Sequence, residues 1–161
     1  MTVRELAPGE TALAFEAMLA LRPRLPDERE FVRRVDELQR PQGYRLVGVV
    51  EDDGLVSAVA GFRVMEMLAY GRILYIDDLS TLPAARRRGH GRALLEWCAE
   101  EAVRAGCVAL QLDSNVGPER QDAHRLYFNN GMRISSYHFT RELGAPAAIP
   151  TAGRRSSRRR P

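Results

Sequence analysis

Apolar residues recur along this chain with two spacings, and their order predicts a mixed α/β domain. Alternation of apolar and polar residues, as at Val108, Leu110 and Leu112, is typical of a strand. Spacing of three or four residues, as at Phe31 and Val35, is typical of a helix with one buried face. Together the spacings predict strands at 2–6, 44–51, 55–65, 73–82, 108–112 and 134–143, with helices at about 13–21, 27–38, 87–105 and 118–131.

Capping and turn residues indicate where several of these elements begin and end. Asp27 lies three residues before Glu30, which is the arrangement of a helix N-cap and its capping-box partner. The Asp-Asp-Gly run at 52–54 predicts a hairpin between two apolar segments, because such a turn needs residues that accept positive φ. Gly106 is expected to close the helix that precedes it.

The segment 79–92 combines a strand end, two glycines and a helix start, which is an anion-binding geometry. Pro83 has no N–H and therefore ends the strand. Gly89 and Gly91 let the backbone approach a ligand, and the unpaired N–H groups of the new helix point toward it. A pyrophosphate would fit there. A dinucleotide fingerprint would need a third glycine at Leu94, and a Walker loop would need a lysine, which this chain lacks.

The same segment resembles the acyl-CoA-binding motif of the GNAT superfamily of N-acyltransferases, written Gln/Arg-x-x-Gly-x-Gly/Ala. Arg86, Gly89 and Gly91 stand at its three defining positions, directly after an apolar strand. The resemblance extends over residues 2–143 and implies the α/β GNAT fold, a mixed central sheet of six to seven strands flanked by about four helices. It also implies acetyl-CoA as co-substrate, held by Leu79, Thr81, Arg86, Arg87, Arg88, Gly89, His90, Gly91 and Arg92.

The resemblance also implies chemical roles for single residues. The backbone N–H of Leu79 would face the thioester carbonyl, and backbone groups of Thr81 would pair with the pantetheine arm. Tyr127 resembles the tyrosine that hydrogen-bonds the cofactor sulfur and acts as general acid; the alternative is a packing role on the core face of its helix. Arg120 stands where the family often has an asparagine that contacts the cofactor, so Asn115 is the candidate replacement.

Asp77 and Asp78 interrupt the apolar strand 73–82 and are candidates for binding an amine or taking its proton. Strict alternation places Asp77 on the face of Leu79 and Asp78 on the opposite face, unless a bulge breaks the alternation. GNAT proteins often carry an acid at the position of Asp77, which makes Asp77 the first candidate. The alternative is that arginines or backbone N–H groups satisfy both acids structurally.

Arg22 and Arg24 lie between the first two predicted helices, a connection that tends to overhang the acceptor site in GNAT-like proteins. They either suit a carboxylate of the acceptor or are solvated. An acceptor that resembles an amino acid would use these arginines and the two aspartates together. A small molecule is favoured over a peptide. His90, His124 and His138 have no recognisable nucleophile partner and are left out of the catalytic set.

Composition predicts one soluble domain at 1–143 and a disordered arginine-rich tail at 144–161. Five of the 24 basic residues lie in the tail, which leaves 19 basic against 21 acidic residues in the domain. Nucleic-acid binding by the tail is disfavoured, because no aromatic residues interleave with its arginines. Cys98 and Cys107 fit buried thiols rather than a disulfide scaffold, and neither has a metal-like spacing with a histidine, so no metal is expected. With no membrane span and no signal-peptide pattern, a cytoplasmic location is expected.

The sequence therefore predicts an acetyl-CoA-dependent N-acetyltransferase in which a primary amine attacks directly within a ternary complex. One alternative is a non-catalytic acyl-CoA-binding regulatory module, which would need neither Tyr127 nor Asp77. Another is an acyltransferase that acts on a protein or an RNA-associated substrate. Pairing of two copies through the final strands would give a homodimer.

Overall fold

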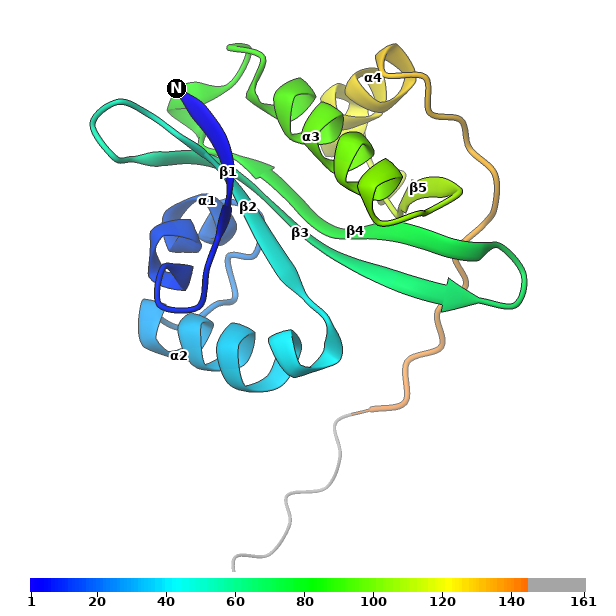
Figure 1. The fold of residues 1–161 in the computed structure, drawn as a ribbon, viewed down its shortest axis with the longest axis horizontal. Coiled ribbons are helices and arrows are strands. Elements are labelled where there is room, and N and C mark those ends of the chain that lie inside the picture. The colour runs from blue at the N-terminus through cyan, green and yellow to red at the C-terminus, as the bar shows by residue number, and fades with distance from the viewer. Residues whose placement is uncertain (145–161) are drawn as a thin grey trace, which may run out of the picture.

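A computed structural model describes residues 1–144 and shows a five-stranded sheet in the order β1-β2-β3-β4-β5 (Figure 1). Antiparallel pairing joins the first four strands, and β5 pairs with β4 in parallel. A parallel neighbour requires a crossover connection, and the long helix α3 supplies it. The strands are β1 (Thr2–Leu6), β2 (Arg45–Val50), β3 (Val56–Met67), β4 (Gly71–Thr81) and β5 (Ala109–Leu112).

Helices cover both faces of this sheet, with α1 and α2 on one side and α3 and α4 on the other (Figure 1). The chain of α2 continues beyond its α-helical part as a π-helical turn, a form that often occurs beside functional sites. The elements on the first side are η1 (Thr11–Ala14), α1 (Phe15–Leu19), α2 (Glu28–Arg33), η2 (Arg34–Gln39) and η3 (Arg40–Gln42). The remaining elements are η4 (Pro83–Ala85), α3 (His90–Arg104), η5 (Pro118–Arg120) and α4 (Gln121–Asn129).

The core consists of two apolar clusters separated by the sheet. On the α3 side, Leu94 and Leu95 pack against alternate residues of the strands, among them Phe62 and Ile76. Cys98 is fully buried in this cluster, and burial raises the pKa of its thiol to about 12. On the α1 and α2 side, Phe31 packs with residues of the opposite strand face. Both faces of the sheet are thus covered, as alternation in the sequence requires.

The turn residues behave as the sequence predicts. Gly54 has φ +88 in the turn between β2 and β3, and the Asp53 side chain accepts the Leu55 N–H at 3.0 Å. Gly106 follows the end of α3 with φ +70. These positions confirm the predicted hairpin and the predicted end of the helix.

Asp27 caps α2, as predicted, and its replacement by Ala should destabilise the protein. Its carboxylate accepts the Glu30 N–H at 2.8 Å and so satisfies one of the helix's unpaired donors. We expect Asp27→Ala to lower the free energy of unfolding by about 1 kcal/mol, and Asp27→Asn to lower it less, because Asn also caps helices. Urea denaturation measures both. Equal stability of Asp27→Ala and wild type would contradict this role.

The predicted closing strand at 134–143 does not form, so the sheet has five strands rather than six to seven. A strand needs a paired neighbour, and β5 offers an edge of only four residues. The segment after α4 instead contacts the residue that follows β5, with His138 Nδ1 2.8 Å from Asp113 Oδ2. One of the final strands that were expected to pair two copies is therefore absent from the described residues, and the homodimer stays a prediction.

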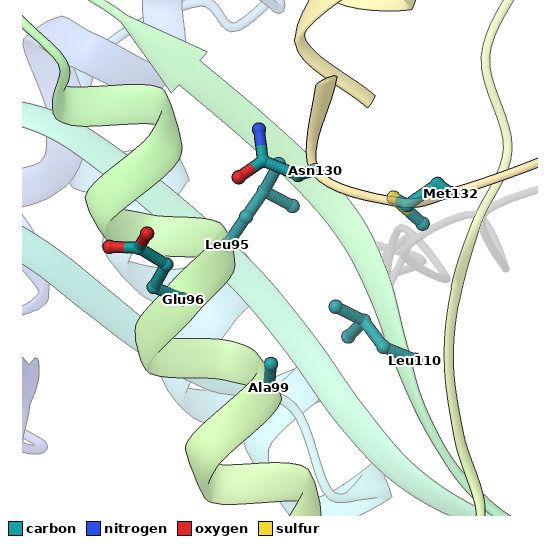
Figure 2. A pocket seen from close by; sticks show the side chains of 6 residues that line it. All are labelled: Leu95, Glu96, Ala99, Leu110, Asn130 and Met132. Atoms are coloured by element: carbon teal, nitrogen blue, oxygen red, sulfur yellow. The ribbon is translucent and has the colours of Figure 1, made fainter. Parts of the chain in front are cut away.

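A small, mostly apolar pocket of about 90 Å³ lies between α3, β5 and the segment after α4 (Figure 2). Leu95 of α3, Leu110 of β5 and Met132 beyond α4 point into it, and Asn130 lies at its edge. None of the predicted site residues lines it. The pocket reflects packing at the sheet edge.

The predicted arginine-rich tail falls almost wholly at 145–161 and thus lies outside the described residues. Within residues 1–144, no helix is both long and apolar enough to cross a membrane.

Candidate active site

The loop between β4 and α3, residues 82–89 and called the anion loop below, contains two left-handed residues close to the start of the helix. Arg87 has φ +62 and Gly89 has φ +86, and α3 begins at the next residue. Left-handed residues turn successive N–H groups toward one point, where an anion is stabilised. They also explain why the helix begins at His90 and not near Arg87 as predicted. A left-handed arginine costs roughly 1–3 kcal/mol, and such strain is common at binding sites.

The two motif glycines serve different purposes. Gly89 needs its positive φ, and a Cβ there would meet nothing within 4 Å. Gly91 instead permits contact between helices, since its Cβ would lie 2.9 Å from Leu126 Cδ2 of α4. The first glycine of the motif thus permits a left-handed backbone conformation, and the second permits close contact between α3 and α4.

The side chains that are predicted to bind the co-substrate do not all face solvent. Arg86 and Arg87 are exposed, and Arg92 is exposed but bonded to Glu96 at 2.7 Å. His90 is 2% exposed, with its Nε2 3.4 Å from Glu51 Oε1. Its ring therefore faces the protein interior, and only its backbone N–H remains for a ligand. Arg88 also reaches toward Glu51, at 3.5 Å, from a side chain that is more than half exposed.

A bulge in β4 brings Asp77 and Asp78 to the same face of the sheet. Asp78 is opposite Gly61 of β3, whereas Phe62 is opposite Ile76, so Asp77 is the extra residue. Phe62 and Ile76 face the α3 cluster, and both aspartates bind side chains on the α1 and α2 side. The bulge therefore overturns the alternation expected for strict pairing.

Each aspartate is held by its own partners. Asp78 accepts a hydrogen bond from the Tyr44 hydroxyl at 2.8 Å and another from Arg22 Nε at 2.8 Å. Asp77 accepts from Arg63 Nε at 2.9 Å. Burial raises the pKa of Asp77, although Arg63 opposes the shift. Burial, together with the charge of Asp78, also raises the pKa of the Tyr44 phenol well above its ordinary value.

Tyr44, Gly61 and Arg63 belong to this cluster and were missed in the sequence. A Cβ at Gly61 would lie 1.7 Å from the Tyr44 hydroxyl oxygen, so the tyrosine lies directly over the glycine. Arg63 stacks on the Tyr44 ring, with its guanidinium carbon 5.5 Å from the ring centre. A glycine inside an apolar strand is a sign of close approach, and it was the available signal.

A pocket of about 160 Å³ opens beside Asp78, between the sheet and the α1 and α2 side. Arg22, from the connection between α1 and α2, lies at this pocket, whereas Arg24 is exposed and does not line it. Of the two arginines predicted to overhang the site, the structure brings one into contact with an aspartate. The lining residues are Met18, Arg22, Leu25, Phe31, Arg34, Val35, Gln39, Tyr44 and Asp78.

Tyr127 lies on α4 and belongs to the apolar cluster on the α3 side, only 8% exposed. Burial raises the pKa of its phenol, while Arg120 and Ser114 oppose the shift. Asn115 is exposed in the loop after β5, and its carbonyl oxygen lies 2.9 Å from the His124 ring. The tyrosine and the two aspartates thus lie on opposite faces of the sheet.

β4 continues beyond the point where β5 stops pairing with it, and its unpaired edge there is called the opening of the sheet below. Pairing of β5 with β4 runs from Ile73 to Ile76 and ends there. The rest of β4, which includes Leu79 and Thr81, has no strand partner on that side among the described residues. A ligand in this opening would have the aspartates on one side, α4 on the other, and the anion loop at the end of the strand.

Comparison with known proteins decides the family. The family model described as Acetyltransferase (GNAT) family matches residues 12–132. The chain belongs to the GNAT family. Its sequence is 31% identical over 135 residues to an uncharacterized N-acetyltransferase, YhdJ, of Bacillus subtilis (strain 168), covering 83% of this chain and 92% of that protein.

Two further relatives bear on chemistry and fold. An aminoalkylphosphonate N-acetyltransferase of Salmonella typhimurium is 40% identical over 68 residues, which cover 42% of this GNAT chain and 43% of that protein. A crystal structure of the aminoglycoside N-acetyltransferase AAC(6')-Iy in complex with CoA has a TM-score of 0.73 at 15% identity, covering 89% of this chain and 95% of that one. The second likeness shows the GNAT fold.

Proposed function

We propose that this GNAT protein transfers an acetyl group from acetyl-CoA to the primary amine of a small molecule, by direct attack in a ternary complex. One observation carries the proposal: the two aspartates lie on β4 beyond the point where it stops pairing with β5, and the anion loop follows the end of the same strand. The CoA complex of a protein with the same fold and the aminoalkylphosphonate relative support the cofactor and the acceptor.

The anion loop would hold the diphosphate of the co-substrate. The backbone N–H groups from Arg87 to Gly91 would donate to the diphosphate at the start of α3, and Arg86, Arg87, Arg88 and Arg92 carry exposed positive charge. Leu79 and Thr81 would bind the pantetheine arm along the open edge of β4. Asn115 lies in the loop after β5 and would contact the same arm.

Residues on the two sides of the opening would supply the base and the acid of the reaction. Asp78 would bind the acceptor's ammonium, and Asp77 would take the proton that frees the lone pair for attack on the thioester carbonyl. The Leu79 N–H would stabilise the negative charge that develops on the carbonyl oxygen. As the carbon–sulfur bond breaks, the Tyr127 phenol would give its proton to the leaving thiolate, and the second proton lost by the attacking nitrogen would pass through solvent to the phenolate and restore Tyr127.

CoA binding and turnover on wild type and Gly89→Ala test this function. Gly54 is a matched control, since both glycines have φ near +87 and a Cβ at either would meet nothing within 4 Å. By calorimetry, we expect Gly89→Ala to bind CoA about tenfold more weakly, while Gly54→Ala binds like wild type. Thiol release is then measured with a panel of amines. Absence of CoA binding by wild type would overturn the proposal, whereas binding without turnover of any amine would favour the regulatory module.

The pH dependence of kcat/KM should report Asp77. Its carboxylate must be ionised to accept a proton, and burial raises its pKa. Activity should therefore fall on acidification at a higher pH than an exposed aspartate, ordinarily near 3.9, would give. Asp77→Asn should lower kcat/KM about 10²-fold and remove this acid limb. The exposed hairpin residue Asp53 provides the control Asp53→Asn, which should keep the wild-type profile. An unchanged limb in Asp77→Asn would assign it to another group.

A further inference from the structure

Arg22 forms an ion pair with Asp78, the carboxylate that is proposed to bind the acceptor's ammonium. The guanidinium therefore occupies that place with a charge of the same sign as an ammonium. Its Nε lies 2.8 Å from Asp78 Oδ1, and its Nη2 donates to the Asp77 carbonyl oxygen at 3.2 Å. The arginine side chain is 54% exposed, and that of Asp78 is 12% exposed. The guanidinium thus lies at the pocket, on a side chain that is more than half exposed.

We infer that Arg22 stands in for the acceptor's ammonium, and that the acceptor is a short amine that also carries an anionic group. On binding, the ammonium takes Asp78 and the anionic group takes the released guanidinium. This inference rests on the proposed function and names the substrate class of the same site.

The first argument is charge balance. Asp78 is largely buried, and its other oxygen is fixed by the Tyr44 hydroxyl at 2.8 Å. A carboxylate in such a place needs a cation at all times, because an unpaired buried charge is strongly unfavourable. An amine without an anionic group would displace Arg22 from Asp78 and give its guanidinium no new partner. An amine with an anionic group exchanges one ion pair for two and leaves no charge unpaired.

The second argument is which partner can move. Asp78 is part of β4 and paired with β3, and Tyr44 is 2% exposed. Arg22 lies in the short connection between α1 and α2 and reaches Asp78 with an exposed, flexible side chain. The arginine can therefore swing away while the carboxylate stays in place. Its planar fork suits a carboxylate or phosphonate in bidentate geometry.

The third argument is the size and polarity of the pocket. It has a volume of about 160 Å³, which limits the acceptor to a few heavy atoms. Arg34 lines the same pocket and adds a second guanidinium beside its bond to Glu30. Met18 and Phe31 give the remaining wall an apolar character. A short carbon chain between an amine and an acid group matches this lining.

Matched acceptors test the inference: 3-aminopropanoate against propylamine, and 2-aminoethylphosphonate against ethylamine, with thiol release as the readout. For wild type, we expect kcat/KM to be at least about tenfold higher for the anionic member of each pair. In Arg22→Gln the ratio should fall toward one, mainly through a higher KM for the anionic amine. Arg22→Lys should keep part of the preference. The exposed α2 residue Arg29 supplies the control Arg29→Gln, which should keep the wild-type ratio.

Calorimetric binding of 3-aminopropanoate and propylamine to the CoA-loaded protein gives a second readout that needs no turnover. Equal affinity for the two amines, binding of neither, or a preference that survives in Arg22→Gln would overturn the inference. Turnover of propylamine at the rate of 3-aminopropanoate would leave the proposed acetyltransferase function standing. Failure of wild type to bind CoA would instead defeat that function itself.

Discussion

Replacement of Tyr127 by Phe should lower kcat about 10²-fold while CoA affinity stays within about threefold of wild type. Tyr127 is 8% exposed, and burial raises the pKa of its phenol, so the phenol holds its proton through neutral pH and a proton is available for the thiolate. Phenylalanine keeps the ring that packs in the apolar cluster on the α3 side. The loss should therefore appear in kcat and not in the folding of α4. Thiol release at saturating concentrations of both substrates measures it.

Tyr70→Phe is the matched control for this experiment. Tyr70 lies in the turn between β3 and β4 and is 47% exposed, so loss of its hydroxyl should change neither kcat nor stability. A wild-type kcat in Tyr127→Phe would return Tyr127 to a packing role. Tyr127 belongs to the core cluster, as a packing residue would. The kinetic test is therefore the one that separates a packing role from a catalytic role.

Replacement of Gly61 by Ala should destabilise the protein and weaken acceptor binding together. The new Cβ would lie 1.7 Å from the Tyr44 hydroxyl oxygen and 2.3 Å from its ring carbon Cζ, so the tyrosine must leave its place. Overpacking of this kind costs about 1–3 kcal/mol, which is roughly 3 °C in Tm for each kcal/mol. The displaced tyrosine would also lose its hydrogen bond to Asp78. Thermal unfolding and the KM for the amine measure the two effects.

Two variants separate the steric effect from the hydrogen bond. Tyr44→Phe removes only the hydroxyl, so it should raise the amine KM with a smaller loss of stability. The double variant Gly61→Ala with Tyr44→Ala relieves the clash, and its destabilisation should be less than the sum of the two single changes. Additive effects would show that Tyr44 and Gly61 do not interact as the structure shows.

Local signals predicted much of the anion loop but not how each residue serves it. The order of strand, proline, glycines and helix locates the loop correctly, because each residue acts through its own backbone. The inward turn of His90 and the contact of Gly91 with Leu126 depend on neighbours from the turn after β2 and from α4. Such contacts join residues far apart in the chain and leave no periodic trace in it.

The closing strand shows the opposite failure. Residues 134–143 alternate only partly, with apolar side chains at Ile134, Tyr137 and Phe139, and all three are highly exposed. Propensity describes a single segment, whereas a strand exists only when a neighbour pairs with it. The four-residue β5 provides too short an edge.

The sequence by itself determined the family, the order of elements from β1 to α4, and the loop that is proposed to hold the co-substrate. These features follow from spacing, capping and backbone conformation, which act over a few neighbouring residues. Only the tertiary structure decided the acceptor face. A single bulge at Asp77 turned both carboxylates to one side, and packing then brought Tyr44, Arg63 and Arg22 to them. Register between strands is set by pairing across the whole sheet, and it is therefore invisible in any one segment.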